Sequence, residues 1–168
     1  LSVTLYLMVK KVEVVFLGRD RAEAEFRFAG GSSSTPILAI DVRASGCSDF
    51  LSALERWRSN VLALPNEKRT LRGSPEFDNL ISDEVDHVSI LIRELILRAR
   101  DEFVRPYVET ELCHCRAVPT DVVDRAIVSG CHSIQSVART TSAGTSCGTC
   151  KPDTEKIIAY RLNRRAKS

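Results

Sequence analysis

Long apolar runs, a large excess of one charge and internal repeats are all missing from this chain of 168 residues. An apolar stretch near the start, residues 5–9, ends at Lys10 and Lys11, far short of the about 20 apolar residues that a membrane span requires. The small-residue cleavage site of a signal peptide is also missing. The net charge of +2 is too small to demand a nucleic-acid partner. We therefore expect a cytoplasmic protein that does not bind a membrane, and the charge disfavours a nucleic-acid partner.

Catalytic motifs are missing as well. No nucleophile–base pair, phosphate-binding loop or pair of carboxylates stands out, so we do not expect an enzyme. What remains is an ordinary globular composition, with 43% hydrophobic and 27% charged residues. A chain of this length can build one good core or two small ones.

Alternating apolar residues predict an antiparallel sheet in the N-terminal part of the chain. Three stretches alternate apolar with polar residues, and short turn-forming segments separate them. Neighbouring strands joined by short turns favour antiparallel pairing. The expected strands are residues 3–16, 24–28 and 37–42, and the expected turns are residues 18–21 and 30–35.

Two later stretches have the period of a helix. The first follows the last strand, with Ser48 or Asp49 as its expected N-cap. The second, residues 82–104, carries the strongest apolar stripe in the chain and should end before Pro106. Residues 65–75 between them are expected to form a loop or a short irregular segment. We place a domain boundary after the second helix, which gives an α+β domain of residues 1–105 and a small helical domain of residues 106–168.

The second domain contains four cysteines in two close pairs, Cys113 with Cys115 and Cys147 with Cys150. Thiols placed in this way hold a disulfide, a zinc ion or an iron–sulfur cluster. A reducing cytosol disfavours disulfides. Zinc sites usually use C-x₂₋₄-C pairs, and Cys113-x-Cys115 makes a tighter bite than tetrahedral zinc prefers. We favour the cluster and keep zinc as the main alternative.

A helix is predicted after each cysteine pair. Unpaired backbone N–H groups and the positive end of the helix dipole gather at a helix start, where they stabilise a negative metal–thiolate centre. Gly144 and Gly148 allow backbone amides to come close to sulfur. The expected helices are residues 121–128 with Thr120 as N-cap, a middle helix of residues 133–139, and residues 152–162.

The cysteine spacing, together with Ala-Gly-Thr-Ser-Cys-Gly-Thr-Cys at residues 143–150, closely resembles the BFD-like [2Fe-2S]-binding domain. That domain occurs in bacterioferritin-associated ferredoxins, nitrite reductases and NifU proteins, and the resemblance covers about residues 111–162. It implies a compact all-helical fold and a role in electron transfer or iron–sulfur and iron homeostasis, with a redox or iron–sulfur partner protein. It also implies that four residues bind one [2Fe-2S] cluster: Cys113, Cys115, Cys147 and Cys150.

Three neighbouring residues of metal-binding type are expected to lie outside the ligand set. Cys131 follows the first helix of this domain and is interpreted as a small buried hydrophobe. His114 lies between two ligands but should point away from them, toward solvent or a hydrogen-bonding role beside the cluster. His132 receives the same interpretation.

A second resemblance covers the first hundred residues. The Gly-Cys at Cys47 after the last strand, and His87 at the start of the long helix, are similar to the NifU/IscU iron–sulfur scaffold domain. Val88 replaces the cysteine that follows the histidine in that family, and residues 18–20 lack another. The resemblance thus implies a scaffold domain that has lost its assembly site, serving partner recognition or dimerisation, so a homodimer is expected as one possibility.

Two further function classes stay open. One is a zinc-stapled interaction module, including a nucleic-acid-binding module that uses the basic tail of residues 161–167. Aromatic residues do not interleave with these charges, which disfavours nucleic acid. The other is an active iron–sulfur assembly scaffold, for which one cysteine and one histidine are too few ligands.

Overall fold

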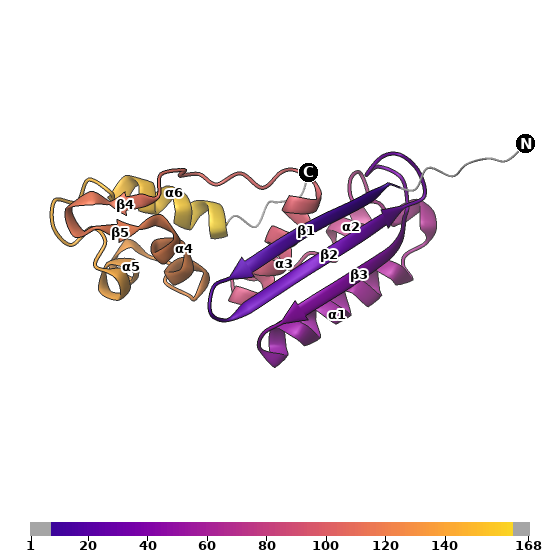
Figure 1. Ribbon diagram of the computed structural model, residues 1–168, viewed down its shortest axis with the longest axis horizontal. Helices are drawn as coiled ribbons and strands as arrows, with labels where there is room; N and C mark the ends of the chain where they lie inside the picture. The colour runs from indigo at the N-terminus through magenta and orange to yellow at the C-terminus, as the bar shows by residue number, and fades with distance from the viewer. Residues whose placement is uncertain (1–7, 163–168) are drawn as a thin grey trace, which may run out of the picture. The chain divides into compact units, whose positions relative to one another are not determined.

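A computed structural model describes residues 8–162, and the chain separates into two compact units (Figure 1). One unit contains the chain up to Asp83 together with Leu91–Phe103. The other contains Glu84–Ile90 and, of the described residues, 104–162. Helix α3 (His87–Ala99) contributes residues to both units. The predicted boundary after residue 105 stays a prediction.

Three antiparallel strands form the sheet of the first unit, in the order β1 (Val9–Phe16), β2 (Asp20–Phe28) and β3 (Ile37–Ser45). Side chains alternate between the faces, so that Phe26 and Ile40 are buried while Glu25 and Asp41 lie on the open face. The predicted sheet is therefore confirmed. Residues 3–7 of the first predicted strand lie outside the described residues.

Aromatic side chains hold the helices of the first unit to its sheet. The ring of Trp57 in α1 (Ser48–Ala63) lies 6.3 Å, edge on, from the ring of Phe26 in β2. The ring of Phe77 in α2 (Pro75–Asp78) also lies edge on to Trp57, with 6.3 Å between the two ring centres. Such T-shaped contacts add to the stability gained from burying large apolar surfaces.

Several predicted boundaries in this unit are wrong. The turn expected at residues 18–21 is shorter, because β2 begins at Asp20. The expected caps Ser48 and Asp49 lie inside α1, whose N-cap is Cys47 without a side-chain hydrogen bond. Residues 65–75 form a short irregular segment, as predicted, with a 3-10 helix, Asn66–Lys68, and the first residue of α2.

Helix α3 is shorter at both ends than the predicted residues 82–104. Asp86 Oδ1 accepts hydrogen bonds from the backbone N–H groups of Val88 (2.9 Å) and Ser89 (3.1 Å), which fixes the helix start. Asp101 adopts a left-handed conformation with φ of 58°, which ends the helix well before Pro106.

The second unit is helical apart from two short strands that pair as a hairpin, β4 (Glu111–Cys113) and β5 (Val118–Pro119). A 3-10 helix, η2 (His114–Arg116), connects them. The helices are α4 (Thr120–Val128), α5 (Ile134–Thr141) and α6 (Lys151–Leu162). Together the two units confirm the predicted α+β class.

Caps in the second unit differ in detail from those expected. Thr120 is the first residue of α4 rather than its cap, and its hydroxyl donates to the carbonyl of Glu109 at 2.5 Å. Ser133 caps α5 through a reciprocal capping box with Ser136.

Across residues 8–162, none of the helices has both the length and the apolar character needed to cross a membrane.

A buried ion pair joins two parts of the first unit. Arg100, only 1% exposed, pairs with Asp78 of α2, and its Nε donates to the carbonyl of Leu71 at 2.6 Å. Its guanidinium also lies 5.5 Å from the ring centre of Phe77. The cation therefore satisfies a buried carboxylate that would otherwise be costly to keep away from water.

Replacing Arg100 with Ala should lower the free energy of unfolding of this unit by about 3–5 kcal/mol, because the Asp78 carboxylate loses its buried partner. Urea unfolding followed by the fluorescence of Trp57, the single tryptophan, measures the change. Arg43→Ala, at an exposed position of β3, is the control and should cost less than about 1 kcal/mol. Equal losses in the two variants would contradict a special role for the buried pair.

Candidate metal centre

Local elements of the second unit bring both cysteine pairs to one place. Cys113 ends β4 and Cys115 lies in the short helix η2 that follows. Cys147 lies in the loop after α5, and Cys150 directly precedes α6. The predicted helix after each pair is therefore confirmed, with α4 following the first pair and α6 the second, although the first pair itself lies in a hairpin.

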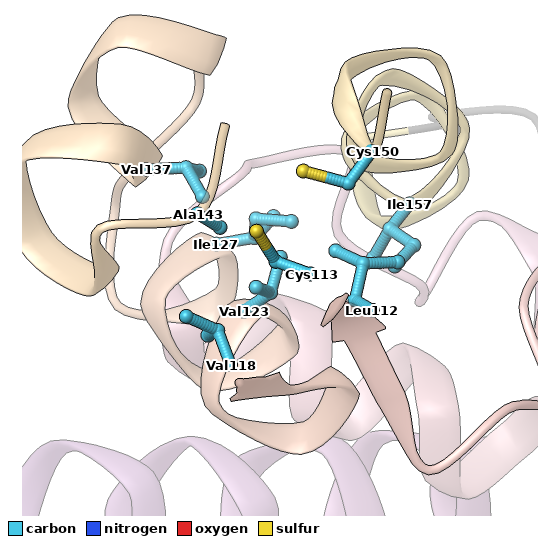
Figure 2. Close-up of a cluster of buried hydrophobic side chains, with 9 residues drawn as sticks. All are labelled: Leu112, Cys113, Val118, Val123, Ile127, Val137, Ala143, Cys150 and Ile157. Atoms are coloured by element: carbon cyan, nitrogen blue, oxygen red, sulfur yellow. The ribbon is translucent and has the colours of Figure 1, made fainter. Parts of the chain in front are cut away.

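The four sulfur atoms converge although the two pairs are far apart in sequence. Cys115 Sγ lies 3.3 Å from Cys147 Sγ and 3.7 Å from Cys113 Sγ. The Cys113 and Cys150 thiols are also in hydrogen-bonding contact. In Figure 2 the sulfurs of these two residues point into the same space between the surrounding elements.

Burial divides the four cysteines into an inner and an outer pair. The inner pair, Cys113 and Cys150, is 1% and 5% exposed and belongs to an apolar cluster with Val123, Ile127 and Val137 (Figure 2). The outer pair, Cys115 and Cys147, is exposed. The site is thus anchored in the core on one side and open to solvent on the other.

Glycine turns let the backbone approach the sulfurs closely. Gly144 and Gly148 have φ of 75° and 77°, a left-handed conformation that side chains disfavour. A Cβ added at Gly144 would lie 3.3 Å from Cγ of Lys151 and 3.9 Å from Cys150 Sγ. A side chain at Gly144 would therefore be strained by the backbone conformation, and the Lys151 side chain would have to shift slightly to make room.

Backbone N–H groups from these turns and from η2 donate to the sulfur atoms. Cys113 accepts from the amides of Gly144 and Arg116, and Cys115 accepts from the amide of Cys147. These donors stabilise negative charge on sulfur, as the dipoles of a preorganised site do. The sequence predicted such amides at Gly144 but gave no signal for Arg116.

The two thiols of the outer pair have pKa values shifted in opposite directions. Hydrogen bonds from the hydroxyl and the amide of Thr149 lower the pKa of Cys147 to about 7. The hydroxyl lies 2.9 Å from the sulfur. The amide of Cys147 lowers the pKa of Cys115, but the thiols beside Cys115 and its partial desolvation outweigh that effect, so its pKa is raised.

The inner pair shows the same division. Desolvation raises the pKa of Cys113, but the donors from Gly144, Cys150 and Cys115 outweigh it, so its pKa is lowered. Burial, followed by the neighbouring Cys113, raises the pKa of Cys150 to about 11. Each close pair therefore contains one sulfur that favours ionisation and one that resists it.

Four thiols at these separations form a donor set for a soft metal. Tetrahedral zinc with Zn–S bonds of about 2.3 Å places sulfurs about 3.8 Å apart, and iron in iron–sulfur clusters is held by the same thiolate ligands. The separations of 3.7 and 3.3 Å are near the sulfur–sulfur distance around a single metal ion. The geometry therefore provides a set of four sulfur donors for a metal centre, and the metal must be inferred from other evidence.

Comparison with known proteins supplies that evidence. A family model of the BFD-like [2Fe-2S] binding domain matches residues 112–160, a segment that contains all four cysteines. This match confirms the resemblance of the C-terminal part and supports an iron–sulfur cofactor in this segment. Neither a curated protein nor a solved structure matches the chain. The resemblance of the N-terminal part to NifU/IscU scaffolds stays a prediction.

Three further residues of metal-binding type in the second unit, two histidines and one cysteine, lie outside the group of four sulfurs. His114 is exposed and its Nδ1 lies 2.9 Å from Glu111 Oε1. Cys131 packs against the apolar cluster, with its sulfur 3.3 Å from Thr140 Oγ1. His132 precedes the cap of α5, and its Nε2 is buried without a hydrogen-bond partner among residues 8–162.

The two N-terminal candidates occupy structurally defined positions. Cys47 is half-buried in front of α1, and its backbone N–H donates to Asp20 Oδ1 at 2.8 Å. His87 is the first residue of α3. Val88, which stands where the scaffold family has a cysteine, is buried.

In protein prepared without metal, we expect Cys147 to react first with iodoacetamide. With a pKa of about 7, its reactive thiolate fraction rises steeply as the pH increases through neutrality, whereas Cys150 at about 11 stays protonated. Mass spectrometry of peptides alkylated between about pH 6 and pH 8 gives the order. Cys131 is the internal reference, and alkylation of Cys150 before Cys147 would contradict these pKa values.

Proposed function

We propose that this protein is a one-electron carrier holding a [2Fe-2S] cluster on Cys113, Cys115, Cys147 and Cys150. The convergence of these four sulfurs, within the segment that matches the BFD-like family, is the observation that carries the proposal. When bound, such a cluster supplies reversible one-electron chemistry at a potential set by hydrogen bonds to sulfur and by exposure.

The inner cysteines give the site its rigidity. Cys113 and Cys150 are packed among apolar side chains from α4, α5 and α6, including Ile127, Val137 and Ile157. A densely packed surrounding allows little rearrangement when charge changes. The chain thus keeps the sulfur positions nearly fixed between two oxidation states, which favours fast electron exchange.

The outer cysteines give a redox partner access. Cys115 and Cys147 are exposed, so a partner protein can approach this side of the site within a short distance. His114 Nδ1 and Glu111 Oε1, 2.9 Å apart, lie beside Cys115 in the chain. We place partner docking on this side, and we assign partner recognition or dimerisation, rather than catalysis, to the first unit.

Variants at two cysteines test the ligand set. Cys147→Ala should abolish the brown visible absorption of the purified protein, because one of the four proposed thiolates is lost. Cys131→Ala should keep it, since Cys131 contacts Thr140 and the apolar cluster instead. Iron analysis and visible spectra of the two variants check this.

The electron-carrying role has its own test. Reduction of the wild-type protein with dithionite should bleach the visible spectrum reversibly and give a paramagnetic signal at low temperature. A colourless protein, or colour that survives loss of Cys147, would contradict the proposed ligands. A coloured protein that cannot be reduced and reoxidised would contradict the carrier role alone.

The hydroxyl of Thr149 should raise the reduction potential, because its hydrogen bond stabilises negative charge on Cys147. Thr149→Val should therefore shift the midpoint potential to a more negative value in a redox titration. Thr145→Val is the matched control, since the Thr145 hydroxyl donates to the carbonyl of Ser142 at 2.8 Å and should leave the potential unchanged. A positive shift for Thr149→Val would contradict this role.

A further inference from the structure

The sheet of the first unit has two edges, β1 and β3, with β2 between them (Figure 1). An edge strand presents a row of backbone N–H and C=O groups that a further strand can bind. The two edges of this sheet differ in how those groups are used.

The hydrogen-bond pattern shows which groups of β1 face outward. The backbone N–H of Phe28 donates to the carbonyl of Met8 at 3.0 Å, and the N–H of Arg19 donates to the carbonyl of Phe16. The backbone N–H and C=O groups of the even-numbered residues of β1 therefore face β2. Because these groups alternate along a strand, those of the odd-numbered residues point to the open edge. These residues are Val9, Lys11, Glu13 and Val15.

The outward groups of β1 are accessible. All four residues are exposed, and within residues 8–162 no hydrogen bond to their outward backbone groups is found. An open groove of about 560 Å³ lies along the strand. Its lining includes Lys10, Lys11, Val12, Glu13, Arg98 and Phe103.

The opposite edge is partly closed by a helix side chain. The same alternation turns the carbonyl of Ile40 in β3 outward. Arg58 of α1 already donates its Nε to this carbonyl at 2.8 Å. A strand added at β3 would have to displace this hydrogen bond, so β1 is the available edge.

We propose that β1 pairs antiparallel with β1 of a second copy of this chain, about a two-fold axis at Val12. In this register Lys11 lies opposite Glu13 of the second copy, and Glu13 lies opposite its Lys11. Val9 and Val15, 48% and 46% exposed, lie opposite each other in the same way. Opposite charges and β-branched residues in facing positions stabilise paired strands.

Charge selects this register over its neighbours. The nearest alternatives that keep the same backbone groups facing place Lys11 opposite Lys11, or Glu13 opposite Glu13. Both juxtapose like charges, which destabilises the pairing. Within each copy, Lys11 pairs with Glu25 at 3.1 Å and Glu13 pairs with Arg21 at 2.5 Å. The alternation of positive and negative side chains would therefore continue from one copy to the other across the joined sheet.

Sedimentation equilibrium of the full chain over a range of concentrations tests the proposal. The wild type should be a dimer at high concentration, and Lys11→Glu or Glu13→Lys should each raise the dimer dissociation constant about tenfold or more. The double variant K11E/E13K restores opposite charges in the proposed register, so it should recover dimerisation. Asp41→Lys on β3 is the matched control and should leave the constant unchanged.

Hydrogen exchange of the wild type gives a second readout that needs no variant. The amides of Lys11 and Glu13 should be protected at high concentration and exchange rapidly on dilution, whereas those of Lys10 and Val12 stay protected throughout. A wild type that is monomeric at every concentration, a dimer unaffected by the single swaps, or a double swap as weak as either single one would overturn the proposal.

Discussion

Mutual repulsion of four sulfur atoms is the constraint on which the second unit depends. Cys115 lies within 3.7 Å of two other cysteine sulfurs, and all four cannot be ionised together without a cation. The pKa values show the conflict, because in each close pair the pKa of one thiol is lowered and that of the other is raised. A bound metal centre removes it by supplying positive charge to all four thiolates.

The surrounding structure serves to hold these sulfurs in place. The hairpin of β4 and β5 carries the first pair, and the glycine turns and the start of α6 carry the second. Arg161 of α6 donates to both oxygens of Asp124 in α4, at 2.7 and 2.6 Å, which ties the helices that frame the site. The apolar cluster then buries the inner cysteines and leaves the outer ones to solvent.

The convergence of the four cysteines was predictable because cysteine spacing and glycine positions are local properties of the sequence. The three strands were predictable for a similar reason, since alternation in a half-buried sheet appears directly in the residues. The hairpin around Cys115 was not predictable, because Ala117 adopts a left-handed conformation, φ 49°, without being glycine. The role of Thr149 depends on a contact that only the folded loop reveals.

The predicted ends of strands and helices were wrong where residues distant in the sequence determine them. The start of β2 at Asp20 depends on the amide of Cys47, which lies 27 positions along the chain. The early end of α3 depends on the conformation of Asp101 rather than on Pro106. Apolar period predicts that a helix exists, but caps and tertiary hydrogen bonds set its ends.

The first unit has a different kind of site from the second. Its sheet presents mixed charges on the open face, and its β1 edge carries a self-complementary order of charge. If two copies join there, each brings one cysteine-ligated centre to the assembly. The first unit then determines how many centres a partner meets, and the second unit determines their chemistry.

Elemental analysis of protein purified without oxygen tests the metal assignment most directly. Two irons and two acid-labile sulfides per chain, with zinc below stoichiometric amounts, are the predicted result. One zinc per chain, with neither iron nor sulfide, would contradict the assignment and make the four thiolates a structural zinc site.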